Sequence, residues 1–164
     1  MAEEHYFLDK DRIPVFIGKE GTIKRALEKK FNCVLKIDSE SGQVKVISED
    51  AVNTFLISNI ISAVNLGHSP ITAMKLEDES FVLDMIDVKP LVRGPERLKV
   101  VLGRVIGKEG STRKLIEEMT KCHVSIKSPY VSIIGPFENT HLVHEALEML
   151  IKGASHKTIY SFLS

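Results

Sequence analysis

The chain has 164 residues, of which 43% are hydrophobic and 27% are charged, and this balance is typical of a folded globular protein rather than a disordered tail. Its 22 basic and 22 acidic side chains cancel, which excludes binding to nucleic acid or membranes through bulk charge alone. The two cysteines, Cys33 and Cys122, are too few for a disulfide framework. They are typical of a reducing compartment, so we expect a cytoplasmic protein.

No segment predicts an export signal or a membrane span. The first ten residues are acidic and lack both a basic region and a long apolar run. Residues 51–74 contain no Asp, Glu, Lys or Arg, but their Asn, Ser and Thr side chains are too polar for a bilayer. We interpret this stretch as an uncharged helix that packs on a sheet.

The chain contains an internal repeat. Residues 17–21, Ile-Gly-Lys-Glu-Gly, recur unchanged as residues 106–110, and the same offset matches Cys33 with Cys122. Five identical residues followed by matched chemistry indicate a duplicated module rather than chance. We therefore predict two domains, residues 1–78 and residues 79–164.

Both modules predict the same element order, which is strand, helix, helix, strand, strand, helix. In the first we expect a strand at 6–8, a short helix after Asp11, a helix capped by Thr22, strands at 34–37 and 44–47, and a helix at 51–66. In the second we expect a strand at 81–88, a helix through 98–106, a helix capped by Ser111, strands at 124–126 and 131–134, and a helix at 140–151. A short helical tail follows each copy. This order implies an α+β fold in which helices cover one face of a three-stranded antiparallel sheet.

The Gly-x-x-Gly turn between two helices is the strongest functional signal. Its glycines allow a sharp turn and let another backbone approach closely, and the turn leads into a helix N-terminus that favours an anion. Lys19 and Lys108 add a mobile cation. A turn of this kind clamps the backbone of a nucleic acid, although a lone copy would also suit a plain helix connector. Two matched copies favour RNA binding.

Basic side chains accompany both turns, but the second module is the more cationic. Residues 100–164 have a net charge of +2, whereas residues 1–66 have −1. We therefore expect the second module to be the main binder. The basic helix residues could instead form a solvated face. With ten aromatic side chains and no Trp, the chain predicts a backbone clamp and an aliphatic groove rather than stacking. The candidate RNA-binding residues are Arg104, Ile106, Gly107, Lys108, Glu109, Gly110, Arg113 and Lys114, with Gly18, Lys19, Glu20, Gly21, Lys24 and Arg25 in the first module.

The pattern of Ile-Gly-x-x-Gly, basic helix, Cys and apolar strand resembles the type I K-homology (KH) domain in both copies. Residues 86–91, 103–110 and 153–160 are also similar to the Partner of Nob One family, and the compact chain is similar to its archaeal members. By that resemblance, Gly107 to Gly110 form the clamp and Arg104 lies beside the groove. In eukaryotic relatives the first turn looks degenerate, whereas here Gly18 to Gly21 are intact.

The resemblance implies a non-catalytic protein that binds the 3′ region of small-subunit ribosomal RNA and needs no cofactor. It also implies the Nob-type endonuclease and the alpha subunit of translation initiation factor two as partners. Two alternatives remain open: a general KH module for single-stranded RNA or DNA, and a protein-docking adaptor.

An enzyme or a metal site has little support in the sequence. His141 and His144 lie near Glu145 and Glu148, but their spacing is not that of a zinc motif and no further ligand is evident. Cys122 next to His123 has no third group to orient a nucleophile. We expect the histidines on a helix surface and the cysteines in the core.

Overall fold

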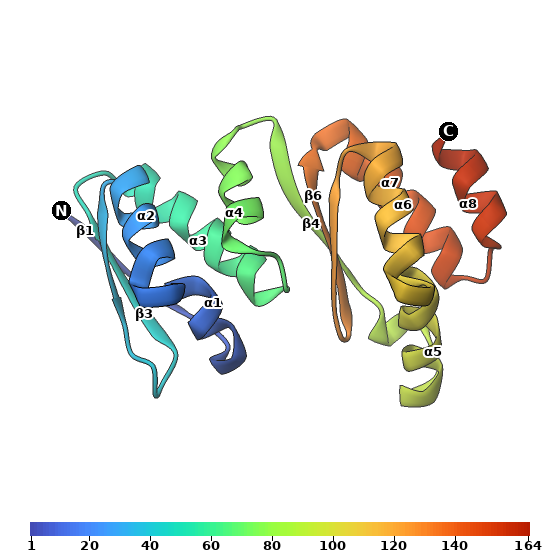
Figure 1. Cartoon of the computed structure of the whole chain (residues 1–164), viewed down its shortest axis with the longest axis horizontal. Coiled ribbons are helices and arrows are strands. Elements are labelled where there is room, and N and C mark those ends of the chain that lie inside the picture. Colours follow the sequence, from blue (N-terminus) through green and yellow to red (C-terminus); the bar gives the residue numbers. More distant parts are fainter. The chain divides into compact units, whose positions relative to one another are not determined.

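The computed structural model describes all residues from 1 to 164, which form two compact units, Met1–Glu77 and Asp78–Ser164. Each unit contains a three-stranded antiparallel sheet and several helices (Figure 1). The predicted mixture of helices with two three-stranded antiparallel sheets is thus confirmed. None of the helices combines the length and the apolar character that crossing a membrane requires.

In the first unit, helices pack on one face of a sheet whose strand order is β1-β3-β2. Its elements are β1 (Ala2–Phe7), α1 (Ile13–Ile17), α2 (Thr22–Lys30), β2 (Cys33–Ile37), β3 (Gln43–Ser48), α3 (Ala51–Asn65) and α4 (Pro70–Ala73). Phe16, Leu27, Val44 and Ile57 are fully buried and join α1, α2, β3 and α3 in one core.

The second unit has the same topology, with strand order β4-β6-β5. Its elements are β4 (Phe81–Asp87), α5 (Gly94–Ile106), α6 (Ser111–Thr120), β5 (His123–Lys127), β6 (Tyr130–Pro136), α7 (Phe137–Ile151) and α8 (His156–Leu163). Its core includes Val101, Ile116, Ile133 and Leu147, all of them fully buried.

The two units differ most in the segment before the glycine turn. Ten positions separate Leu8 from Gly18, whereas nineteen separate Val88 from Gly107, so the second unit has nine extra residues here. Leu8 and Val88 are equivalent, because each donates its amide to the turn between the other two strands, to Gly42 O at 2.8 Å and Pro129 O at 3.0 Å. Both units have a 3₁₀ turn here, at Lys10–Arg12 and Lys89–Leu91, so the extra residues mainly lengthen the helix that follows, from 5 residues in α1 to 13 in α5.

Side-chain caps begin three of the helices, α3, α4 and α8. Asp50 accepts a hydrogen bond from Val52 N, and Ser69 and Ser155 accept from Thr72 N and Thr158 N, so each caps its helix. Our prediction that Thr22 and Ser111 are caps is wrong: both are the first helical residues, and the preceding glycine occupies the cap position. The first helix likewise starts at Ile13, with Asp11 inside a preceding 3₁₀ turn rather than at the cap.

Both cysteines are buried at equivalent places in the two cores. Burial raises the pKa of the Cys33 thiol to about 11 and also raises that of Cys122. A Cβ added to Gly135 would lie 2.6 Å from Cys122 Sγ, so the thiol fills the space that this glycine leaves open. The cysteines therefore act as small apolar packing groups and not as nucleophiles.

Candidate nucleic-acid interface

The two Gly-Lys-Glu-Gly turns have the same backbone conformation. The first glycine has φ of 78° in one unit and 77° in the other, Glu20 and Glu109 both have φ of 55°, and the last glycine has φ of 74° and 75°. Three of the four positions thus lie in the left-handed region or beyond it, where glycine is favoured. The repeated pentapeptide therefore adopts the same backbone conformation in both units.

The first glycine of each turn is required by close packing. An added Cβ at Gly107 would lie 2.2 Å from Thr112 Oγ1 and 2.6 Å from the Thr112 amide nitrogen, and one at Gly18 would lie 2.4 Å from Ile23 Cγ1. No side chain fits at these distances. The turn is therefore pressed against the first turn of α6 or α2, which fixes its orientation relative to the helix N-terminus.

Hydrogen bonds within the turn leave its outer surface open. Gly110 donates to Gly107 O at 3.1 Å, and Ser111 donates to Lys108 O. These bonds use the amides at the end of the turn, whereas the Lys108 and Glu109 amides lie outside them. Lys108 and Lys19 are exposed and form no ion pair within the structure. Each turn thus presents a free ammonium group beside a helix N-terminus, which suits a phosphate.

A second basic side chain folds back over each turn. Arg25 Nη1 donates to Glu20 O at 2.7 Å, and Lys114 Nζ lies 3.4 Å from Glu109 O. Both residues stay exposed, so their charge lies beside the lysine of the turn. The acidic Glu20 and Glu109 are also exposed and weaken the positive potential there.

Arg113 is more constrained than the other candidate residues on α6. It forms a 2.7 Å ion pair with Glu117, whose second carboxylate oxygen accepts the Val124 amide at 2.9 Å on the free edge of β5. Glu28 accepts the Leu35 amide in the same way in the first unit, next to the half-buried Lys24. In both units the glutamate at this position therefore links the helix to the edge strand. In the second unit it also neutralises the charge of Arg113.

The structure does not bring Arg104 to the glycine turn. Its guanidinium donates to Leu150 O at 2.9 Å and to Ala154 O at 2.7 Å, on the side of α5 that faces α7. We expected this side chain beside the groove, but its donors satisfy carbonyl groups at the end of α7 instead. Ile106, in contrast, is 37% exposed, as a candidate RNA-binding residue must be.

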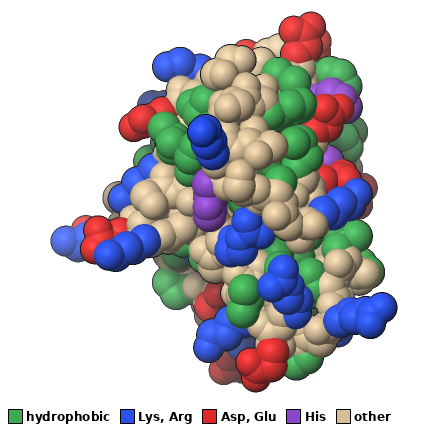
Figure 2. Space-filling view, turned by 90° about the vertical axis from the view of Figure 1, so that its right-hand side faces the viewer, with side chains coloured by type: hydrophobic (Ala, Val, Ile, Leu, Met, Phe, Trp, Pro, Cys, Tyr) green, Lys and Arg blue, Asp and Glu red, His purple; other side chains and the backbone are tan.

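Sequence reasoning missed several basic residues at the start of α5. Lys89, Arg93, Arg97 and Lys99 are exposed and form no ion pairs, against two acidic residues, Asp87 and Glu96, on the same segment. Figure 2 shows Lys and Arg side chains spread over the lower half of this side of the second unit, at the level of α5 in Figure 1. The signal was present as local charge, because residues 89–99 contain four basic side chains and one acidic side chain.

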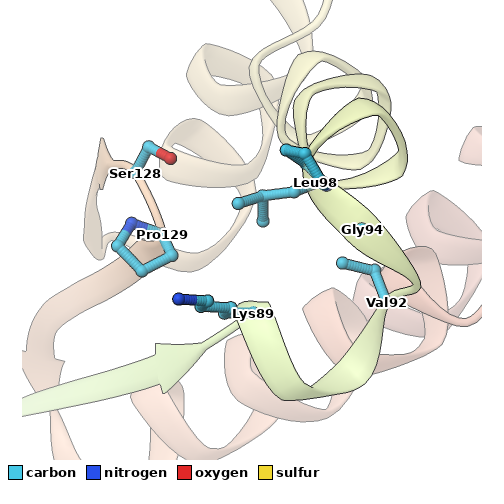
Figure 3. Close-up of a pocket in the computed structure, with 7 residues that line it drawn as sticks. Lys89, Val92, Gly94, Leu98, Ser128 and Pro129 are labelled. Atoms are coloured by element: carbon cyan, nitrogen blue, oxygen red, sulfur yellow. The ribbon is translucent and has the colours of Figure 1, made fainter.

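A hollow of about 510 Å³ opens at the same end of α5. We call it the α5 hollow, and it is lined by Lys89, Val92, Gly94, Pro95, Leu98, Ser128 and Pro129. In Figure 3, Val92 and Leu98 point into it from one side and Pro129 faces them from the turn between β5 and β6. The aliphatic lining agrees with the predicted kind of groove, but it lies at the opposite end of α5 from the glycine turn.

The histidines of α7 form ion pairs instead of a metal site. His144 lies 2.6 Å from Asp84 on β4 and 2.6 Å from Glu148, and His141 lies 2.9 Å from Glu145. Partial burial lowers the pKa of His144, but the hydrogen bonds and charges of Asp84 and Glu148 outweigh this effect and raise it overall. The chain contains no group of three or more side chains arranged to hold a metal ion.

The second unit combines a three-stranded antiparallel sheet, helices on one face and a Gly-Lys-Glu-Gly turn between two of them, and these features define a KH-type RNA-binding module. Residues 82–164 match the family model described as "Eukaryotic type KH-domain (KH-domain type I)". The chain belongs to the PNO1 family of KH-domain proteins, which confirms the resemblance seen in its motifs.

Relatives and solved structures agree with this assignment. A KH domain-containing protein of Methanocaldococcus jannaschii is 36% identical over 95% of this chain, which spans 70% of that protein. The pre-rRNA-processing protein PNO1 of Chaetomium thermophilum is 30% identical over 65% of this chain, which spans only 42% of its length. A chain in the crystal structure of an a/eIF2alpha-aDim2p-rRNA complex from Pyrococcus horikoshii OT3 is 35% identical, with a TM-score of 0.88; the match covers 99% of this chain and 92% of that one.

Proposed function

We propose that this protein is a non-catalytic, cytoplasmic, single-stranded RNA-binding protein built from two tandem type I KH domains, residues 1–78 and 79–164. In each domain the Gly-Lys-Glu-Gly turn clamps the RNA backbone, and the second domain is the main binder. The observation that carries the proposal is the equal backbone shape of the two turns, each with an exposed lysine at a helix N-terminus.

The proposed contacts follow from what each side chain does in the structure. Lys108 and Lys114 supply free charge at the second turn, and Lys19 and Arg25 do so at the first. Lys24 and Arg113 are secondary contacts, because Arg113 shares its charge with Glu117. Ile106 offers apolar surface to a base. Arg104 is left out, since its donors bind carbonyl groups of the protein.

The proposed target is the 3′ region of small-subunit ribosomal RNA during pre-rRNA processing and subunit assembly. The relative from Chaetomium thermophilum is named for pre-rRNA processing, and the archaeal complex contains rRNA and a/eIF2alpha. We propose the same two partners here, together with a Nob-type endonuclease that would supply the cleavage that this chain does not perform.

The test is a salt titration of binding to a ten-nucleotide RNA from the 3′ end of small-subunit rRNA. Three to five phosphate contacts predict a log–log slope of about −2 to −4. The double variant Lys108→Asp with Glu109→Asp should weaken binding at least about tenfold and leave the melting temperature nearly unchanged, because both side chains are exposed. A scrambled RNA of equal length measures the sequence preference.

The first turn provides the matched control. The same change at Lys19 and Glu20 places identical charges on an identical backbone, and we expect a loss of about threefold or less. Equal losses at both turns would contradict the ranking of the domains. A flat salt titration for every RNA would refute RNA binding and leave the docking adaptor.

A further inference from the structure

Most of the lining of the α5 hollow comes from the segment before the glycine turn, where the second unit has nine extra residues. Those residues place Lys89 and Val92 opposite Ser128 and Pro129, whose turn contacts Val88 through the 3.0 Å bond to Pro129 O. In the first unit α1 starts at Ile13, soon after β1. The equivalent turn there, residues 38–42, contains Asp38 and Glu40. The hollow thus lies where the second unit has its insertion and an uncharged Ser-Pro turn in place of an acidic one.

The hollow has the size and chemistry of a site for a flat, partly apolar ligand. Its volume of about 510 Å³ falls within the range of small-molecule sites. Val92, Pro95, Leu98 and Pro129 supply aliphatic walls, and Figure 3 shows the Lys89 side chain reaching toward Pro129 across the opening. An apolar wall beside a single ammonium group fits a nucleobase with its attached phosphate.

Charge around the hollow points to a polyanion rather than to an apolar peptide. Lys89 lines the hollow, and Arg93 lies in the chain between the lining residues Val92 and Gly94. Both are exposed and free of ion pairs, and Arg97 and Lys99 follow within two turns of α5. Asp87 and Glu96 are the only acidic side chains of this segment, so four basic groups outnumber them. Phosphates are the ligands that such a set attracts.

The hollow also continues the proposed interface. One face of α5 carries Pro95, Lys99 and Gly103, which are spaced four residues apart. The helix ends at the glycine turn. A Cβ built on Gly103 would meet no heavy atom within 4 Å, so a strand can lie close to the helix there. About 18 Å of helix, at 1.5 Å per residue, separates the hollow from the turn.

We propose that the α5 hollow is an additional nucleotide site, which binds one base of the RNA outside the segment held by the glycine turn. The base packs against Val92, Leu98 and Pro129, and its phosphate pairs with Lys89 and Arg93. The site rests on the proposed function. It lets the second domain contact a longer stretch of RNA than the glycine turn contacts alone.

The experiment compares the ten-nucleotide 3′ rRNA with its nested four-nucleotide pieces in fluorescence anisotropy with the full chain. We expect the long RNA to bind about tenfold tighter than the best tetranucleotide. A single abasic replacement outside that tetranucleotide should cost about fivefold, in line with the loss of one buried base. The variant Lys89→Glu with Arg93→Glu should remove both effects and keep tetranucleotide affinity within about twofold.

The matched control is Lys121→Glu with Lys157→Glu, which makes the same change in net charge at exposed positions that form no ion pair, after α6 and on α8. Equal loss in this control would make the length effect a general charge effect and overturn the proposal. It would also be overturned if no flanking abasic position mattered while tetranucleotides bound normally. Failure of every tetranucleotide to bind the wild type would instead remove the proposed function of the turn.

Discussion

Arg104 on α5 donates hydrogen bonds to Leu150 O at 2.9 Å and to Ala154 O at 2.7 Å. In the first unit Arg12 does the same to Val64 O at 2.7 Å and His68 O at 2.8 Å. The accepting carbonyl groups occupy equivalent positions at the end of α7 and α3. The two arginines do not occupy equivalent positions, because alignment on the glycine turns matches Arg104 with Val15 and Arg12 with Val101. Each unit thus uses an arginine to satisfy the carbonyl groups at the same helix end, but the two arginines lie about one helical turn apart in the aligned sequences.

Arg104→Ala should therefore destabilise the second unit without weakening RNA binding. We expect a loss of about 2 kcal/mol in the free energy of unfolding, because two charged hydrogen bonds to carbonyl groups disappear. Arg104→Lys should recover only part of it, since an ammonium group lacks the forked donors. Hydrogen exchange of α5 and α7 measures the first effect and anisotropy the second. A large loss of RNA affinity at unchanged stability would contradict this prediction and indicate that Arg104 contacts the RNA.

Gly103 and Gly107 should respond in opposite ways to alanine. Gly107→Ala forces a Cβ onto Thr112 at a φ of 77°, and we expect a loss of at least about 2 kcal/mol of stability. Gly103 lies inside α5 with open space around it, so Gly103→Ala should stabilise by about 0.5–1 kcal/mol. The added methyl group should nevertheless weaken RNA binding about threefold. Thermal melts and RNA titrations of both variants test this pair, and tighter binding by Gly103→Ala would contradict the proposed path of the strand.

Glu109→Gly should strengthen RNA binding. Glu109 holds a φ of 55° in an exposed turn, a conformation that costs about 1 kcal/mol for a side-chain-bearing residue and little for glycine. The change also removes a negative charge from the proposed phosphate site. We expect affinity to rise about threefold at low salt, with the difference shrinking as salt screens the charge, and stability to stay within about 1 kcal/mol. Weaker binding by this variant would indicate that the Glu109 carboxylate itself contacts the RNA.

His144 should make the stability of the second unit depend on pH. Asp84 and Glu148 raise its pKa above the ordinary value of 6.5, so the folded state binds the proton more tightly than the unfolded state. This contribution is fully present below the ordinary pKa and is lost as pH rises through the raised value. The melting temperature of the wild type relative to His144→Gln should therefore fall as the pH rises above about 6.5. A constant difference would show that the ion pairs do not stabilise the fold.

Local chemistry made much of this architecture predictable. The repeated pentapeptide fixes two turns of one shape, because glycines at set positions allow backbone angles that other residues avoid. Apolar spacing then locates the helices, and α3 starts at Ala51 as predicted, next to the cap at Asp50. The resemblance to the family rests on these short-range motifs. The family-model match and the relatives confirm it.

Tertiary structure alone decided the rest. β1 extends back to Ala2 through Glu3, Glu4 and His5, because pairing with β3 overrides their polar character. Arg104 turns away from the glycine turn because the carbonyl groups of Leu150 and Ala154, far along the chain, need donors. The α5 hollow joins residues 89–98 to residues 128–129, and no local pattern encodes that contact. Sequence spacing determines backbone conformation within an element, whereas the partners of a side chain depend on which elements pack together.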